Sequence, residues 1–173
     1  MLEASRFSAV EALSNGRRVE VRSLRPDDRA DLVAAVGRTS AQSLYRRFFG
    51  VRHSFTEREV AFFLDIDFID HVALVAVVEE GGRPMIVGTG RYIVVQPGKA
   101  EVAFAVVDQH QGQGIGAALM RHLAAVARSA GLHELIAEVL SDNTPMLRVF
   151  EKCGFGLTTK RESGIVHVAL RLS

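Results

Sequence analysis

Hydrophobic positions recur with a regular period along most of the chain. This period switches several times between two residues, as in a strand, and about 3.6 residues, as in a helix. Residues 18–24 alternate like a half-buried strand, and residues 25–36 open with Pro and Asp before apolar residues at helical spacing. Residues 40–66 predict two short helices interrupted near Gly50. Residues 1–16 show no clear period and predict a loose N-terminal arm.

The middle of the chain holds three β-rich segments, over residues 71–80, 85–95 and 100–108, with turn-forming residues between them. Short turns join antiparallel strands, so these segments predict an antiparallel meander. The remaining pattern predicts a helix over 115–130, a strand over 134–140, a helix over 145–152 and a strand over 165–172. The predicted fold class is therefore α/β with a mixed sheet, a meander followed by β-α-β-α-β, in one domain over residues 17–173.

Composition narrows the class of protein. The chain has 173 residues, 48% hydrophobic and 24% charged, which suits one globular domain. Its formal net charge is +1, which gives no broad basic surface for nucleic acid. The longest apolar run, Val72 to Val78, is too short to cross a bilayer, so no membrane partner is expected. Because Cys153 is the only cysteine and the six histidines lack zinc-ligand spacing, we expect no disulfide, no metal and a cytoplasmic location.

A glycine-rich loop separates the third β-rich segment from the helix at residue 115. Its glycines, Gly112, Gly114 and Gly116, allow a close approach of the backbone to a ligand. The free amides of the first helical turn favour an anion, most naturally a phosphate or pyrophosphate. A tight turn that uses glycine only for its geometry accounts equally well for this spacing.

Two known phosphate-binding motifs are tested on this loop. Gly112, Gly114 and Ala117 fit the dinucleotide pattern GxGxxA, and Glu134 follows about 20 residues later, where a ribose-binding acid is expected. That fold requires several parallel strands, whereas the strands before this loop are joined by tight turns and run antiparallel. A nucleotide-binding P-loop is excluded because no Lys followed by Ser or Thr comes after the glycines.

The motif Gln111-Gly112-Gln113-Gly114-Ile115-Gly116 resembles the signature of the GNAT acyl-CoA-dependent N-acyltransferases. A second stretch, "SDNTPMLRVFEKCGF" over residues 141–155, is similar to the later landmark of that family. The resemblance extends over residues 17–172 in the order of the elements. It implies a GNAT fold and an enzyme that transfers an acetyl group from acetyl-CoA to a primary amine by direct attack.

The resemblance also implies which residues bind coenzyme A. The loop would hold the pyrophosphate, the strand before it would lie along the pantetheine arm, and the flanking strands would splay apart to admit it. The residues so implied are Val106, Val107, Gln111, Gly112, Gln113, Gly114, Ile115, Gly116, Ala117, Asn143 and Phe150. Asn143 beside Pro145 fits an ordinary helix cap as well as a hydrogen bond to pantetheine.

The chemistry of amine acetylation requires a proton acceptor, because a lysine amine with a pKa of about 10.4 is mostly protonated at pH 7. Glu101 opens the third β-rich segment, on one face with Ala103 and Ala105, which leave room beside it. Many family members carry their catalytic Glu on this strand, so the resemblance favours Glu101 as general base, with Asn143 also in the catalytic site. The alternative is an exposed Glu beside Lys99.

Phe150 departs from the family pattern, because many members have at this position a Tyr that can protonate the departing thiolate. Tyr45 and Tyr92 are the only tyrosines in the chain, and solvent is an adequate acid for a thiolate of pKa about 8.5. The proton donor is therefore left unassigned. Cys153 fits a small packed residue near a helix end better than a nucleophile, since no His is near it in sequence.

Residues 42–49 and 55–79 resemble the start of the GNAT domain in bacterial Pat-type protein-lysine acetyltransferases. This resemblance implies a protein lysine as acceptor, attracted by the acids Asp65, Asp67 and Asp70, although these also fit a helix end and a loop. A small-molecule amine acceptor and a non-catalytic module that binds coenzyme A are the alternatives. The sequence leaves the acyl-chain length, a homodimer and regulation open.

Overall fold

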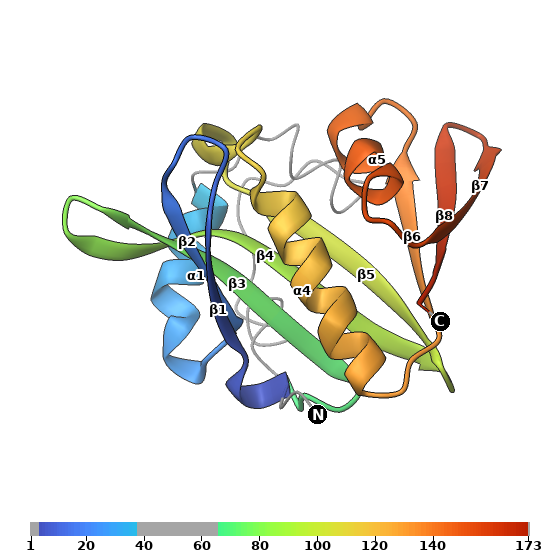
Figure 1. Cartoon of the computed structure of the whole chain (residues 1–173), viewed down its shortest axis with the longest axis horizontal. Helices are drawn as coiled ribbons and strands as arrows, with labels where there is room; N and C mark the ends of the chain where they lie inside the picture. Colours follow the sequence, from blue (N-terminus) through green and yellow to red (C-terminus); the bar gives the residue numbers. More distant parts are fainter. Residues whose placement is uncertain (1–3, 38–65, 173) are drawn as a thin grey trace.

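The computed structural model describes residues 4–37 and 66–172 of the chain. These residues form one eight-stranded sheet in the order β1-β2-β3-β4-β5-β6-β8-β7 (Figure 1). Every neighbouring pair of strands is antiparallel except β5 and β6, which run parallel. The predicted α/β class with a mixed sheet is confirmed.

The N-terminal part supplies one edge of the sheet. Its elements are β1 (Ser8–Ala12), β2 (Arg18–Ser23), a short 3-10 turn (Pro26–Asp28) and α1 (Arg29–Gly37). The segment expected to be a loose arm instead contributes β1, whose five residues pair antiparallel with β2. The two helices expected over residues 40–66 lie outside the described residues, apart from the last residue of that range.

The meander follows as predicted, with β3 (His71–Glu80), β4 (Arg83–Gln96) and β5 (Lys99–Val106). Pairing between β4 and β5 stays in register from Ala100 to Val106, so side chains of β5 alternate strictly between the two faces. A register shift occurs before Ala100, near the turn between the two strands.

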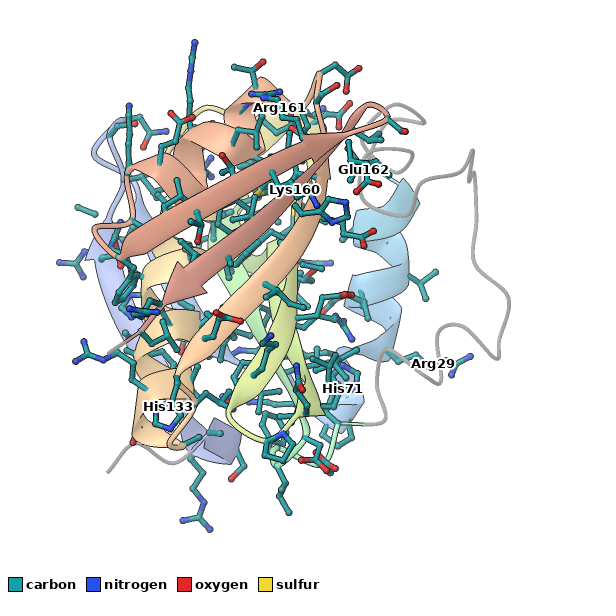
Figure 2. The ribbon with its side chains drawn as sticks, turned by 90° about the vertical axis from the view of Figure 1, so that its right-hand side faces the viewer. Arg29, His71, His133, Lys160, Arg161 and Glu162 are labelled. Atoms are coloured by element: carbon teal, nitrogen blue, oxygen red, sulfur yellow. The ribbon has the colours of Figure 1, made fainter. Side chains whose placement is uncertain are left out.

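The C-terminal part consists of α4 (Ile115–Ser129), β6 (Glu134–Leu140), α5 (Thr144–Glu151), β7 (Gly156–Glu162) and β8 (Ile165–Arg171). Four of these elements match the predicted segments closely. The fifth, β7, was not predicted, and it pairs antiparallel with β8 at the second edge of the sheet. In Figure 2 its charged residues Lys160, Arg161 and Glu162 are labelled, and charges on an edge strand oppose pairing with other chains.

The core lies mainly between the sheet and α4, which crosses one face of β3, β4 and β5 (Figure 1). Its apolar stripe of Ile115, Leu119, Leu123 and Val126 is fully buried, as the sequence predicts. The opposite face carries a smaller cluster that includes Ala35 of α1. None of the helices in the described parts of the chain is long and apolar enough to cross a membrane.

Candidate active site

The sheet divides where β5 and β6 part. The two strands pair over only three positions, from Lys99 opposite Glu134 to Glu101 opposite Ile136. Both strands continue beyond this point, and Figure 1 shows their ribbons diverging toward α5. Backbone groups of β5 that face β6 beyond Glu101 therefore have no strand partner among the described residues, and such groups require another hydrogen-bonding partner.

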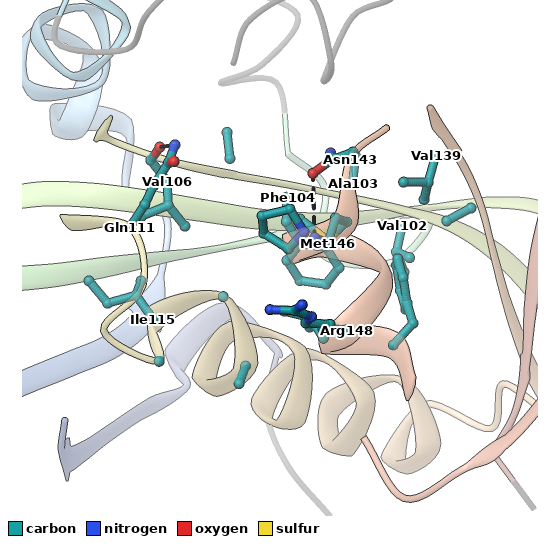
Figure 3. A pocket seen from close by; sticks show the side chains of 18 of the residues that line it. Val102, Ala103, Phe104, Val106, Gln111, Ile115, Val139, Asn143, Met146 and Arg148 are labelled. Carbon is teal, nitrogen blue, oxygen red and sulfur yellow. Dashed lines mark hydrogen bonds between the residues drawn. The ribbon is translucent and has the colours of Figure 1, made fainter. Parts of the chain in front are cut away.

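A cavity of about 400 Å³ lies at this divergence (Figure 3). Val102 and Phe104 line it from the face of β5 that packs toward α4, and Ala103 and Ala105 line it from the opposite face. Residues of both faces of β6 also contribute. Side chains from both faces of the sheet therefore line the gap between β5 and β6. Two substrates can approach this gap from opposite sides.

The glycine-rich loop forms one end of the cavity. Gly112 and Gly114 adopt φ values of +77° and +94°, in the left-handed region that other residues rarely enter. Gly114 is the N-cap of the 15-residue helix α4, and its carbonyl accepts the Ala118 amide at 3.0 Å. The amides of the first helical turn lack partners within the helix, so this terminus is suited to an anion.

Side chains from other parts of the fold brace this loop. The Gln111 side-chain amide donates to the Val106 carbonyl at 3.0 Å, and the Ser14 hydroxyl donates to the Gln113 carbonyl at 3.1 Å. His110, which is buried and lines the cavity, has its Nε2 at 3.3 Å from Oε1 of Glu80. Two hairpins of the sheet therefore hold the loop in place before any ligand binds.

Helix α5 forms the opposite wall. Asn143 is its N-cap, and its Oδ1 accepts the Met146 amide at 3.4 Å (Figure 3). The same side chain lines the cavity, so the capping role and the proposed contact with pantetheine are compatible. Phe150 lies deeper in the wall and meets Phe104 edge to face, with ring centroids 6.2 Å apart. The Cys153 thiol donates to the Phe150 carbonyl at 2.9 Å, which fits a packed residue near the helix end.

Most of the predicted coenzyme A residues come together around this cavity. Those that line it are Val106, Gln111, Gly112, Gly114, Ile115, Gly116, Ala117, Asn143 and Phe150. Val107 and Gln113 do not line it: Val107 is buried in the cluster on the other face of the sheet, where its amide donates to the Val87 carbonyl. Gln113 takes part through its backbone carbonyl, which accepts the Ser14 hydroxyl.

Glu101 lies at the root of the divergence, outside the cavity lining. Its side chain is exposed and points to the face opposite α4, as the alternation of β5 predicts. It stands between Ile93 of β4 and Ile136 of β6 in the pairing. A carboxylate in this position borders the gap from the side on which the small Ala103 leaves space.

Tyr92 does not supply the proton donor that Phe150 lacks. It lies on β4 and is fully buried in the core cluster that includes α4, and burial, with a smaller contribution from the charge of Asp67, raises its pKa to about 12. It is absent from the cavity lining. Tyr45 lies outside the described residues, so the proton donor stays unassigned.

In the acidic loop before β3, one of the carboxylates holds the backbone of the loop itself. Oδ1 of Asp67 accepts the backbone amides of Ile69, Asp70 and His71, each at 2.9 Å, and these bonds, led by that of His71, lower the pKa of Asp67. The Asp70 side chain is exposed, and its carbonyl accepts the Val94 amide at 2.7 Å. The loop therefore lies at the same end of the sheet as Glu101. Asp65 is outside the described residues.

Sequence reasoning missed two charged side chains that line the cavity, Glu138 of β6 and Arg148 of α5. Both are exposed, so their positions in the pattern are those of ordinary surface residues. Their spacing along the chain was the available signal. Alternation places Glu138 on the exposed face of β6, and Arg148 follows Asn143 by a little more than one helical turn. Only the divergence of the strands turns these surface positions into cavity walls.

Comparison with known proteins gives a consistent result. The Acetyltransferase (GNAT) family matches residues 32–155 of the chain. An acetyltransferase of Pseudomonas aeruginosa, PA5475, is 33% identical over 154 residues, which cover 88% of this chain and 82% of that protein. Acetyltransferase Pat of Mycolicibacterium smegmatis is 34% identical over 131 residues, or 73% of this chain, but the matched part spans only 38% of Pat.

Solved structures show the same relationship. The GNAT domain of S. lividans PAT superimposes with a TM-score of 0.85 and 35% identity, over 95% of this chain and 96% of that domain. The yncA protein of Salmonella typhimurium, solved with its cofactor acetyl-CoA, superimposes with a TM-score of 0.72 over 90% of this chain and 94% of that protein. At 20% identity the second likeness concerns the fold alone.

Proposed function

The chain belongs to the GNAT acetyltransferase family, whose members transfer an acetyl group from acetyl-CoA to an amine, and we propose that it acetylates lysine side chains of other proteins, with Glu101 as general base. The observation that carries this proposal is the divergence of β5 and β6 beside a glycine-capped helix. This arrangement offers an anion site and a gap reachable from both faces of the sheet.

The donor site fits coenzyme A in four respects. The glycine loop and the α4 N-terminus offer backbone amides to the pyrophosphate. The exposed Arg148 on the facing wall supplies a positive charge for phosphate, and β5 offers to the amides of pantetheine backbone groups that have no strand partner among the described residues. Phe104 and Phe150 give the gap an apolar wall for the acyl end.

The reaction proceeds by direct transfer. The acceptor nitrogen attacks the thioester carbonyl carbon, the carbon–sulfur bond breaks, and the sulfur leaves as a thiolate. The nitrogen loses a proton, which Glu101 takes directly or through an ordered water. Phe150 has no proton to give, so the thiolate is protonated by solvent, which a leaving group of pKa about 8.5 tolerates.

A lysine of another protein is favoured as acceptor by two observations. The structural likeness to the GNAT domain of S. lividans PAT extends over 95% of this chain at 35% identity. The acids Asp67 and Asp70 lie at the Glu101 end of the sheet, where they attract a cationic acceptor. A small-molecule amine would use the same acids, so it is the rival acceptor.

The test is incubation of a proteome with the enzyme and labelled acetyl-CoA, followed by mass spectrometry. We expect enzyme-dependent acetylation at lysines. Rapid turnover of polyamines, amino acids or amine antibiotics with no labelled lysine would replace the proposal with the small-molecule alternative. Binding of acetyl-CoA with neither transfer nor hydrolysis would identify a non-catalytic coenzyme A module.

A further inference from the structure

Glu138 is the only acidic side chain among the described residues that lines the cavity. It sits at the fifth position of β6, and its side chain is about half exposed, at 51%. Its neighbours in the strand, Ala137 and Val139, are buried in the core cluster that also contains the apolar stripe of α4, so Glu138 points to the opposite face. Glu101 points to this same face.

The pairing of the strands fixes the relation between the two carboxylates. Glu101 is in register with Ile136, so Glu138 lies two residues further along β6, about 6.6 Å along the strand. The corresponding position on β5 is Ala103, across the gap. Its methyl group leaves space between the strands, so Glu101 lies at the root of the gap and Glu138 on its wall.

Among the described residues, the ion pairs around Glu138 leave part of its carboxylate open to a substrate. His167 of β8 has its Nδ1 3.8 Å from the Glu138 carboxylate, and its Nε2 is shared with Glu162 at 3.6 Å. Lys99, at the root, is 3.0 Å from Glu134 instead. Arg91, beside Ala103 on β4, donates to His71 at 3.1 Å.

We propose that Glu138 binds the cationic acceptor amine and orients it into the gap, while Glu101 takes the proton. The inference rests on the proposed function, because it assigns a second residue to the same acceptor site. A carboxylate that pairs with an ammonium group lowers the acceptor KM but also stabilises the protonated amine. A separate base at the root of the gap resolves this conflict, so the two carboxylates have different kinetic signatures.

The experiment compares Glu138→Gln with Glu101→Gln in steady-state kinetics on a lysine peptide. We expect Glu138→Gln to raise the acceptor KM about tenfold, the size of one charge-assisted contact, with kcat within about twofold. Glu138→Asp should recover part of the loss, and the salt dependence of the wild-type KM should flatten in Glu138→Gln. Glu134→Gln, on the same strand and face but outside the cavity, is the matched control.

A binding measurement keeps the inference separate from the proposed function. The enzyme is saturated with an acetyl-CoA analogue that has a methylene in place of the thioester sulfur, and Nα-acetyl-lysine amide is titrated and followed by NMR. We expect binding about tenfold weaker in Glu138→Gln than in wild type. Equal affinity, or a fall in kcat with unchanged KM, overturns the role of Glu138. Absence of any transfer by wild type with this affinity difference intact would count against the proposed function alone.

Discussion

Glu101 and Ile136 are the last residues of β5 and β6 that face each other in register. Up to this pair the sheet is continuous, and beyond it the strands border a cavity. The residue before Glu101, Ala100, is fully buried, whereas Glu101 itself is exposed. The point at which the sheet divides therefore carries a carboxylate on its accessible face.

Replacement of this carboxylate tests its role in proton transfer. We expect Glu101→Gln to lower kcat by about 10²- to 10⁴-fold, the usual contribution of a general base. Acetyl-CoA affinity should stay near normal, because Glu101 is not part of the cavity lining. The deficit should shrink as pH rises, since more of the acceptor amine is then already neutral. An unchanged rate at pH 7 would return Glu101 to the class of exposed strand residues.

The anion site is tested at Gly114, where an added side chain would meet open space, although the φ of +94° strains any residue with a side chain. Gly114→Asp places a negative charge beside the α4 N-terminus, and we expect coenzyme A affinity to fall at least about tenfold by calorimetry. Gly114→Asn has the same size without the charge and should lose less. Gly131→Asp is the matched control, because Gly131 has a φ of +89° at the other end of α4. If all three variants were folded and bound coenzyme A as tightly as wild type, the phosphate site at this loop would be disproved.

Much of this fold could be predicted from the sequence because most elements bury one side. Strands β3 and β6 begin and end at the predicted residues, and α4 carries a regular apolar stripe. The two strands that the pattern did not predict, β1 and β7, are the two edges of the sheet. Neither strand has a fully buried residue, and their sequences do not alternate between apolar and polar residues, so pairing with one neighbour is what makes them strands.

The site shows the same division. Gly112, Gly114 and Asn143 could be identified because their roles depend on local backbone geometry, which leaves a sequence motif. Glu138 and Arg148 could not, because they come together with the loop only where β5 and β6 diverge. The position of a strand divergence depends on pairing between distant segments, and a periodic pattern does not record it.

The position of the Phe104 ring in the cavity wall depends on the absence of a side chain at Gly90. A Cβ at Gly90, the residue of β4 in register with Phe104, would lie 2.9 Å from the Phe104 ring. We expect Gly90→Ala to lower the free energy of unfolding by about 1–3 kcal/mol and to weaken coenzyme A binding as the ring is displaced. Gly156→Ala on β7 meets Arg171 at an ordinary 3.6 Å and should be near neutral in denaturant melts. Equal stability of the two variants would show that the Phe104 ring does not restrict a side chain at Gly90.

The buried pair of Arg22 and Asp28 predicts a dependence of stability on pH. Burial acts to raise the pKa of Asp28, but hydrogen bonds from Arg22, at 2.8 and 2.9 Å, and from the Arg25 amide, at 2.7 Å, lower it overall. A lowered folded-state pKa gives stability that is present above the ordinary carboxyl pKa of about 3.9 and is lost as pH falls below it.

We therefore expect Asp28→Asn to lower the free energy of unfolding by about 3–5 kcal/mol at pH 7, because Arg22 is left buried without its counter-ion. The difference from wild type should shrink as pH falls through and below about 4. Urea denaturation across this range measures it. A difference that stays constant with pH would show that the carboxylate charge is not what stabilises the fold.

The last prediction concerns the surface that a protein acceptor would touch. Asp67 is unsuited to a charge reversal, because its carboxylate holds three backbone amides of the loop. Asp70 is exposed and lies at the Glu101 end of the sheet, so Asp70→Lys changes the charge and leaves those three bonds in place. A lysine within a basic protein segment brings several positive charges across a wide surface, whereas a small amine brings its charge only to the gap.

We accordingly expect Asp70→Lys to raise the KM for a protein acceptor severalfold while the KM for Nα-acetyl-lysine amide changes by less than about twofold. Glu79→Lys is the matched control: Glu79 is also exposed, but it lies near the far end of β3, nine residues along the chain from Asp70 and about 30 Å away. Equal effects of Asp70→Lys on both acceptors would mean that the loop acts only near the gap. That result would favour a small amine as the substrate for which this surface is built.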